Sequence, residues 1–142
     1  MPPLRWLWQC DCVVPSEPGA CRRILDGLLA EMAARDWRKH DLYSVRLAAE
    51  EALANAVRHG NGADGRKRIR IRCRLGSRRV RVGVRDQGQG FDPTMLPDPT
   101  GPDRLEVPNG RGVMLMQAYM SRVRYNAVGN CVIMDKTRDH AL

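Results

Sequence analysis

The stretch RIRIRCRLGSRRVRVGVRD, residues 68 to 86, decides the fold class. Its first half alternates apolar residues with arginines, and its second half repeats the alternation after the short LGSR segment. Such alternation predicts two strands, each with one buried and one solvated side, joined as an antiparallel hairpin. The expected apolar side consists of Ile69, Ile71, Cys73, Leu75, Val80, Val82 and Val84. A sheet with one apolar face needs a second layer to cover it.

The other segments supply that layer and more strands. Apolar residues at helical spacing from Cys21 to Met32 predict an amphipathic helix, and a second helix is expected over residues 41–59. A short helix around 113–120 and a closing hairpin over 123–136 complete the predicted order. Residues 4–14 alternate as a strand, whose expected apolar side carries Leu4, Trp6, Trp8, Cys10, Cys12 and Val14. We therefore expect one sheet with its helices on one face.

Length and composition restrict the class of protein. With 142 residues the chain fits one domain, residues 1–142, that can bury an ordinary core. It has no apolar run of the ~20 residues that span a bilayer, so we expect a cytoplasmic protein. The five cysteines are odd in number and lack CxxC spacing, which favours free thiols over disulfides or a zinc site.

The stretch RLAAEEALANAVRHGNG, residues 46 to 62, places polar side chains in an otherwise apolar helix. Glu51, Asn55 and His59 recur every four residues and share one helix face. The Asn55 amide oxygen suits Mg²⁺, and Glu51 could accept a proton from an attacking hydroxyl. A solvated helix face is the alternative. His59 is expected to cap or pack, and Glu50 to be solvated.

Two glycine-containing segments follow. In VRDQGQGF, Asp86 at a strand end could accept a hydrogen bond from an exocyclic amine, and Gly88 and Gly90 would let a flat ring approach the backbone. In NGRGVMLM, Gly110 and Gly112 precede a helix whose first amides could bind phosphate. Ordinary turns explain either segment taken alone.

Residues 92–109 contain five prolines and no usable periodicity, so they predict a long loop. Loops of this length inside a small domain are usually lids or binding segments. We expect it to close over a ligand.

Together these motifs resemble the histidine-kinase-like ATPase superfamily, which includes gyrase, and within it the anti-sigma-factor serine-protein kinases. The resemblance implies a two-layer α/β sandwich (α+β) with a mixed, mostly antiparallel sheet, and ATP bound under a mobile lid at about 92–109. EALANAVRHG would supply Asn55 as the Mg²⁺ ligand and Glu51 as general base. DQGQGF would hold the adenine amine through Asp86, beside Gly88 and Gly90. The segment NGRGVMLM would wrap the phosphates with Gly110, Arg111, Gly112 and Val113.

By that resemblance we expect an ATP- and Mg²⁺-dependent serine/threonine-protein kinase. It would phosphorylate a small antagonist protein and sequester a sigma factor in a partner switch that regulates transcription. A regulatory module that binds proteins in an ATP-dependent way, without phosphoryl transfer, is the alternative, and Glu51 favours the kinase. We expect neither a two-component histidine kinase nor a gyrase-like machine. A homodimer is compatible with the sequence, and no membrane partner is expected.

The formal net charge of +8 is regional. Alternation places arginines on one side of both hairpin strands, namely Arg68, Arg70, Arg72, Arg74, Arg79, Arg81 and Arg85. An open sheet face kept soluble by charge explains them, and so does an acidic protein partner or a second subunit. The hairpin has no aromatic residues between its arginines, so a nucleic-acid partner is not expected.

Overall fold

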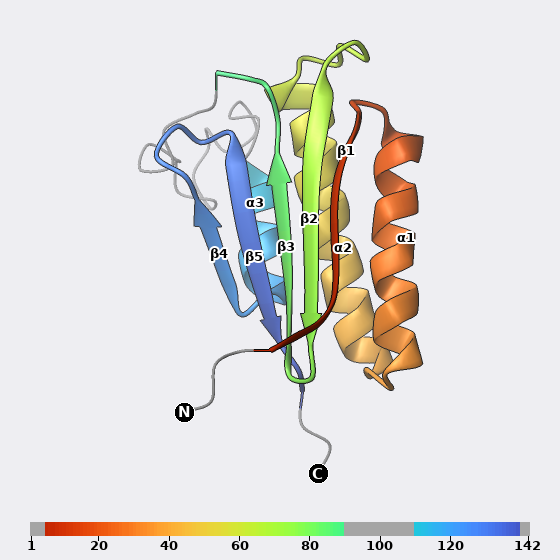
Figure 1. The fold of residues 1–142 in the computed structure, drawn as a ribbon. Helices are drawn as coiled ribbons and strands as arrows, with labels where there is room; N and C mark the ends of the chain where they lie inside the picture. Colours follow the sequence, from red (N-terminus) through yellow and green to blue (C-terminus); the bar gives the residue numbers. More distant parts are fainter. Residues whose placement is uncertain (1–4, 90–109, 140–142) are drawn as a thin grey trace.

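The structure is a computed structural model, which describes residues 5–89 and 110–139. The expected order of helices and strands is confirmed in this part of the chain (Figure 1). The segment expected to form a lid, at about 92–109, lies outside the described residues. The elements are β1 (Trp6–Pro15), α1 (Pro18–Ala34), α2 (Lys39–Asn55), the π-helical turn η1 (Ala56–Gly60), β2 (Arg68–Gly76), β3 (Arg79–Arg85), α3 (Gly110–Tyr119), β4 (Arg122–Tyr125) and β5 (Cys131–Thr137).

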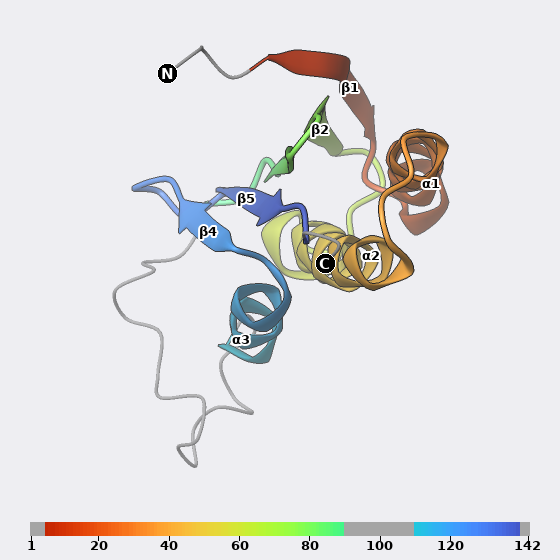
Figure 2. The same cartoon turned by 90° about the horizontal axis from the view of Figure 1, so that it is seen from below.

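The five strands form one sheet in the order β1-β2-β3-β5-β4. Figure 2 shows the helices α1, α2 and α3 on the same face of this sheet, which confirms the two-layer α+β architecture. Each pairing between the described strands is antiparallel, so the sheet expected to be mixed and mostly antiparallel is antiparallel throughout this part. The central strand β3 runs between β2 and β5, and Asp86, which follows it, contacts Gly60 of η1 at the end of α2.

The core lies between the sheet and the helices. Alternate residues of β2 and β3 are buried as the sequence predicts, and they pack against α1 and α2. Leu28, Met32 and Val45 on the helices are among the largest fully buried side chains. No helix in the described part of the chain has the length and apolar character needed to span a bilayer. All five cysteines are free thiols, as expected.

The first strand differs from the expectation at its start. The register with β2 shifts between Trp6, which pairs with Gly76, and Trp8, which pairs with Leu75. This β-bulge adds one residue to β1, so Trp6 no longer shares the inner side with Trp8. Instead the Trp6 ring lies on the outer face of the sheet. Burial alternates along the whole of β1 as expected, but the prediction that Trp6 shares the inner side is wrong, and Leu4 lies outside the described residues.

Truncation of a side chain on the inner face of β2 should destabilise the fold strongly. Ile71 is 1% exposed, so Ile71→Ala leaves a cavity and should cost about 2–5 kcal/mol of unfolding free energy. Val13 on β1 is 57% exposed, and Val13→Ala should stay within about 0.5 kcal/mol of wild type. Urea denaturation of both variants measures the difference, and equal losses would contradict the assignment of the two faces.

Candidate functional site

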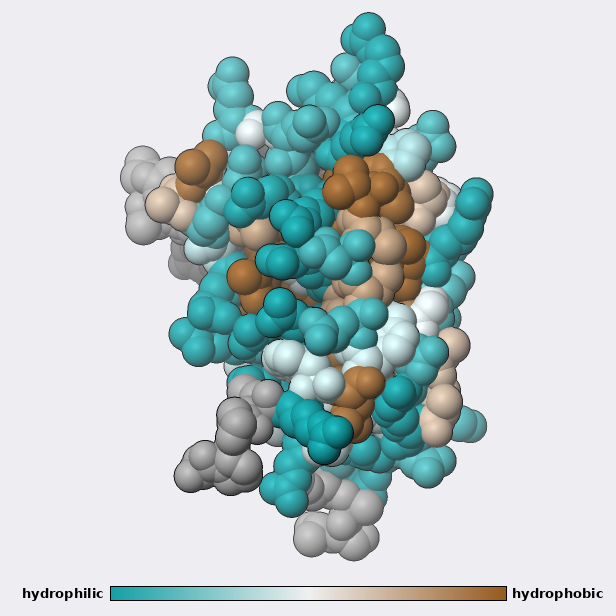
Figure 3. Space-filling view, in the orientation of Figure 1, coloured by the Kyte–Doolittle hydropathy of each residue, from teal (hydrophilic) through white to brown (hydrophobic). Residues whose placement is uncertain are grey.

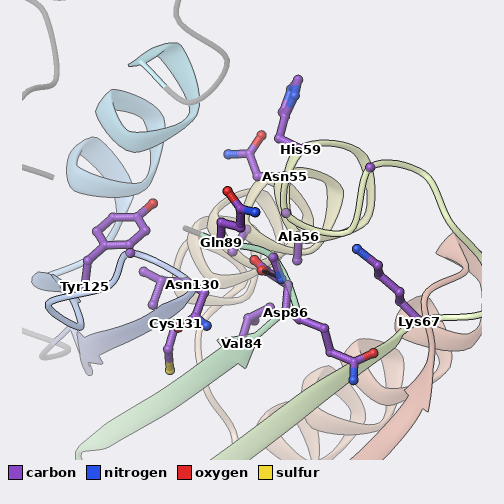
Figure 4. Close-up of a pocket in the computed structure, with 17 residues that line it drawn as sticks. Asn55, Ala56, His59, Lys67, Val84, Asp86, Gln89, Tyr125, Asn130 and Cys131 are labelled. Carbon is purple, nitrogen blue, oxygen red and sulfur yellow. Dashed lines mark hydrogen bonds between the residues drawn. The ribbon is translucent and has the colours of Figure 1, made fainter. Parts of the chain in front are cut away.

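A cavity of about 640 Å³ lies where the end of α2 and the turn η1 approach the ends of β3 and β5. Figure 4 shows Asp86 between three groups of side chains. Asn55 and His59 come from the helix layer, Tyr125 and Asn130 come from the β4–β5 hairpin, and Lys67 precedes β2. The volume and the mixed lining are those of a small-molecule site.

Asp86 follows β3 directly and lies against the turn η1. A β-carbon built on Gly60 would collide with the Asp86 carboxyl group, and one on Gly88 would collide with the Gly60 carbonyl oxygen. The Gly88 N–H donates a 2.8 Å hydrogen bond to Asp86 Oδ1. Both glycines therefore permit two backbone segments to touch, and this contact holds the carboxylate in the cavity.

The electrostatics of Asp86 are those of a carboxylate held partly out of water. Burial raises the pKa of Asp86, while the Gly88 N–H and the charge of Lys67 act in the opposite direction. Desolvation is the larger effect, so the ionised carboxylate is not fully compensated by its described neighbours. A ligand that donates a hydrogen bond to this oxygen pair would supply the missing compensation.

Asn61 joins three segments at the base of the cavity, and no sequence motif indicated this role. Its side chain is fully buried, and its Nδ2 donates to Ser16 Oγ and to the Arg68 carbonyl, each at 3.0 Å. The Gln87 N–H donates to Asn61 Oδ1 at 2.8 Å. One amide thus links the end of β1, the start of β2 and the segment that follows Asp86.

Three residues of the predicted site meet at the start of α3. A β-carbon on Gly112 would stand 2.5 Å from Asn55 Nδ2 and 2.7 Å from Glu51 Oε1. The structure thus brings Glu51 and Asn55 of α2 together with Gly112 of the NGRGVMLM segment. Asn55 is the last residue of α2, and the chain then widens into η1. Such π-turns are rare and frequently mark functional sites.

Glu51 does not line the cavity that contains Asp86. It lines a second cavity of about 370 Å³ between α1 and α2, to which Leu115 of α3 also contributes. Glu51 thus faces the second cavity, whereas Asn55, one helical turn further along α2, lines the first. Of its neighbours on the helix, Glu50 is exposed as expected and also lines the second cavity, and His59 is exposed at the rim of the first cavity rather than packed.

The structure describes some of the remaining predicted site residues. Gly110 begins α3, and Val113 is buried in the hydrophobic core. The side chain of Arg111 and the whole of Gly90 lie outside what the structure describes.

The hairpin and the segment before β2 contribute residues that no sequence motif indicated. Tyr125, Asn130 and Lys67 all line the Asp86 cavity. Burial, and secondly the charge of Glu51, raise the pKa of Tyr125, so this phenol stays neutral. The N–H of Asp86 donates to the Asn130 carbonyl at 2.9 Å, which fixes the hairpin to the end of β3.

The residues around Asn55 fit a nucleotide-bound Mg²⁺ better than a metal held by protein alone. Among the described residues there is no group of three or more His, Cys, Asp and Glu side chains able to hold a metal. Asn55 Nδ2 is buried and has no hydrogen-bond partner in this part of the chain. Because no described protein group fixes that end of the amide, rotation could turn its oxygen toward a cation. Mg²⁺ often takes one or two protein oxygens and completes its shell with phosphates and water.

Comparison with known proteins identifies the class. The sequence model of the histidine kinase-like ATPase domain matches residues 14–136, which reach from the end of β1 into β5. The chain belongs to the histidine kinase-like ATPase domain family. Membership implies ATP binding, and it accords with a cavity that has a carboxylate between helix layer and sheet.

Within the family, the chain is similar to protein kinases. It is 31% identical over 134 residues to the serine-protein kinase RsbW of Bacillus subtilis strain 168, covering 87% of this chain and 81% of that protein. It is also 31% identical over 100 residues to the serine/threonine-protein kinase BtrW of Bordetella bronchiseptica, covering 68% of this chain and 70% of that one.

A solved structure has the same fold. The crystal structure of the RsbU and RsbW domains of a Mycobacterium tuberculosis protein matches with a TM-score of 0.62 at 19% identity. The match covers 92% of this chain and 32% of that longer chain.

A methyl group at Gly112 should damage the site, whereas one at a distant glycine should be tolerated. In Gly112→Ala the new β-carbon would displace Asn55 and Glu51, so we expect a loss of stability of about 1–3 kcal/mol and weaker ATP binding. A β-carbon added to Gly27 on α1 would have nothing within 4 Å, so Gly27→Ala should stabilise by about 0.5–1 kcal/mol. Urea denaturation and ATP calorimetry measure both. Equal behaviour of the two variants would contradict the contact at Gly112.

The raised pKa of Asp86 predicts a cost in stability that depends on pH. The folded protein holds this proton more tightly than the unfolded chain. The cost is therefore absent below the unfolded pKa and complete above the raised folded pKa. Asp86→Asn should raise the melting temperature without ligand at neutral pH, and the gain should shrink at acidic pH.

Asp64 provides the control for this prediction. The side chain of Arg66 lowers the pKa of Asp64, so its charge is favourable in the folded state. Asp64→Asn should bring no gain in melting temperature at neutral pH. A gain for Asp64→Asn equal to that for Asp86→Asn would mean that desolvation of Asp86 is not the cause.

Proposed function

We propose that this protein is an ATP-dependent serine/threonine-protein kinase of the anti-sigma-factor type. In this proposal it phosphorylates a small antagonist protein and sequesters a sigma factor, in a partner switch that regulates transcription. The kinase activity for which both relatives are named supports the first part, and the resemblance of the motifs supports the partners. The observation that carries the proposal is that Glu51 lines the α1–α2 cavity one helical turn from Asn55, which lines the Asp86 cavity.

The nucleotide would occupy the Asp86 cavity. Asp86 would accept a hydrogen bond from the adenine amine, which compensates the desolvated carboxylate. The phosphates would extend toward Asn55 and the start of α3, where Gly112 leaves room and helix amides favour anions. Asn55 would hold Mg²⁺, which neutralises the charge that develops on the transferred phosphoryl group.

Glu51 would act on the acceptor and not on the nucleotide. Its carboxylate lines the second cavity, so a hydroxyl that enters from the side of α1 would meet Glu51 before the phosphates. There the carboxylate would orient the hydroxyl and take its proton as the oxygen attacks phosphorus. This direction of approach suits a Ser or Thr on a separate protein.

A binding module without phosphoryl transfer is the second candidate. It requires Asp86, Asn55 and the phosphate segment but assigns no task to Glu51. The two candidates therefore differ in what replacement of Glu51 does.

Glu51→Gln should separate binding from transfer. The variant keeps the helix and Asn55 but removes the base, so phosphate transfer should fall by about 10²–10⁴ with ATP affinity nearly unchanged. Asn55→Ala should instead weaken the Mg²⁺-dependent part of ATP binding, because the metal loses a ligand. Calorimetry with ATP measures the binding. Mass spectrometry of an intact antagonist protein that binds the chain measures the transferred phosphate.

An exposed carboxylate of α1 that lines neither cavity provides a control, since Asp26→Asn should transfer phosphate at close to the wild-type rate. Transfer at that rate by Glu51→Gln would refute the general-base role. If the wild type transferred no phosphate to a bound antagonist, the binding module would be the correct function.

A further inference from the structure

The outer face of the sheet carries most of the chain's excess charge. Residues that pair directly across antiparallel strands share a face, so the register places the outward arginines of three strands together. We call this surface the arginine face: Arg68, Arg70, Arg72, Arg74, Arg79, Arg81, Arg85, Arg122 and Arg124. Only two carboxylates of the described strands lie on it, Asp11 and Asp135, in a chain of net charge +8.

The arrangement costs stability, which a merely soluble face would avoid. Arg74 lies directly opposite Arg81, and Arg70 directly opposite Arg85. Like charges in such cross-strand positions are destabilising. The described strands place no lysine or glutamate on this face, so the positive charge is neither diluted nor balanced by the usual solubilising mixture.

The two aspartates on this face show how its guanidinium groups bind carboxylates. Arg70 donates from Nε and Nη2 to the two carboxylate oxygens of Asp11 at 3.0 and 2.8 Å, and Arg72 Nε adds a bond of 3.1 Å. Arg81 donates to both oxygens of Asp135 at 2.7 and 3.1 Å. These bonds lower the pKa of Asp11 and raise the pKa of Arg81, so both groups stay charged. The remaining arginines of the face make no ion pair with a carboxylate of the described chain.

The β-bulge adds an aromatic centre to this surface. The Trp6 ring lies 6.0, 5.8 and 5.7 Å from the guanidinium carbons of Arg74, Arg79 and Arg81. At the neighbouring edge strand, Val13 is exposed on the same face. Figure 3 views this side of the molecule and shows hydrophilic surface over most of the sheet with hydrophobic patches between.

We propose that the arginine face is a docking surface for an acidic region of another protein. Tryptophan and arginine enriched together, with lysine and glutamate depleted, is the composition of protein–protein interfaces and of their energetic centres. Guanidinium groups of this face already donate paired hydrogen bonds to two aspartates, and the same geometry suits the carboxylates of a partner. A partner's carboxylates would also relieve the repulsion between the paired arginines.

Other occupants fit less well. Single-stranded nucleic acid binds through aromatic rings that are free to stack on bases, whereas three arginines already cover Trp6. An anionic membrane attracts lysine as well as arginine. It gives no reason for a face that carries arginine alone. A second copy of the chain would bring an equal positive charge against this one.

The test uses the full chain and fluorescence anisotropy with three labelled probes. These are a copolymer of glutamate and tyrosine, a thymidine oligonucleotide of similar charge, and vesicles of phosphatidylglycerol and phosphatidylcholine. The variant Arg74→Glu/Arg85→Glu reverses two arginines of the face that lack carboxylate partners among the described residues. Its control, Arg23→Glu/Arg46→Glu, makes the same charge change at exposed positions of α1 and α2.

We expect the copolymer to bind more tightly than the oligonucleotide or the vesicles. The face variant should weaken copolymer binding about tenfold or more and the control less than about twofold, with the ATP-induced rise in melting temperature retained by both. Equal weakening by both variants would reduce the effect to net charge and overturn the proposal. Tighter binding of the oligonucleotide, with a steep fall in affinity as salt increases, would assign the face to nucleic acid instead. Preference for the vesicles, or no binding of the copolymer at low salt, would overturn it equally.

Discussion

The buried amide of Asn61 fixes the position of the helix layer relative to the end of the sheet. Its three hydrogen bonds reach two strands and the backbone after Asp86, with no solvent in between. An unpaired buried polar group costs about 1–3 kcal/mol, so these bonds are made together or not at all. Together with the contact between Gly60 and Gly88, this anchor holds the carboxylate of Asp86 beside the end of the helix layer that carries Asn55.

The site gains its chemistry at the expense of stability. At Gly60 and Gly88 two backbones touch where no side chain fits, and the contact keeps Asp86 partly desolvated. The Nδ2 of Asn55 is likewise buried without a partner among the described residues. Both groups lack full compensation from this part of the protein, and both lie where a nucleotide and its cation would compensate them. Ligand binding should then stabilise the part of the site whose polar groups lack partners in the free protein.

The sequence predicted those parts of the fold in which the pattern is regular and long. The β2–β3 hairpin and the helices α1 and α2 have clear periods, because each buries one complete side against the other layer. Trp6 was assigned to the wrong face because the β-bulge adds one residue and reverses the alternation of faces at the start of β1. The amino-acid composition gives no sign of such a bulge. The motif residues Glu51, Asn55 and Gly112 do meet, although α2 and α3 are far apart along the chain, because the resemblance to a known family had placed both motifs in one site. Asn61, Lys67 and Tyr125 act through contacts between distant segments, which a single sequence does not display.

The alternation of apolar residues and arginines along β3 also gives the two faces of the strand different roles. Along β3, Val84 faces inward and lines the Asp86 cavity, while the next residue, Arg85, faces outward among the arginines. A partner on the outer face would therefore contact the reverse side of the strand that positions Asp86. No atom of the partner would need to enter the cavity for the two surfaces to share this strand. The two surfaces are therefore separated by a single layer of backbone, with the apolar side chains of β3 toward the nucleotide site and its arginines toward the outer face.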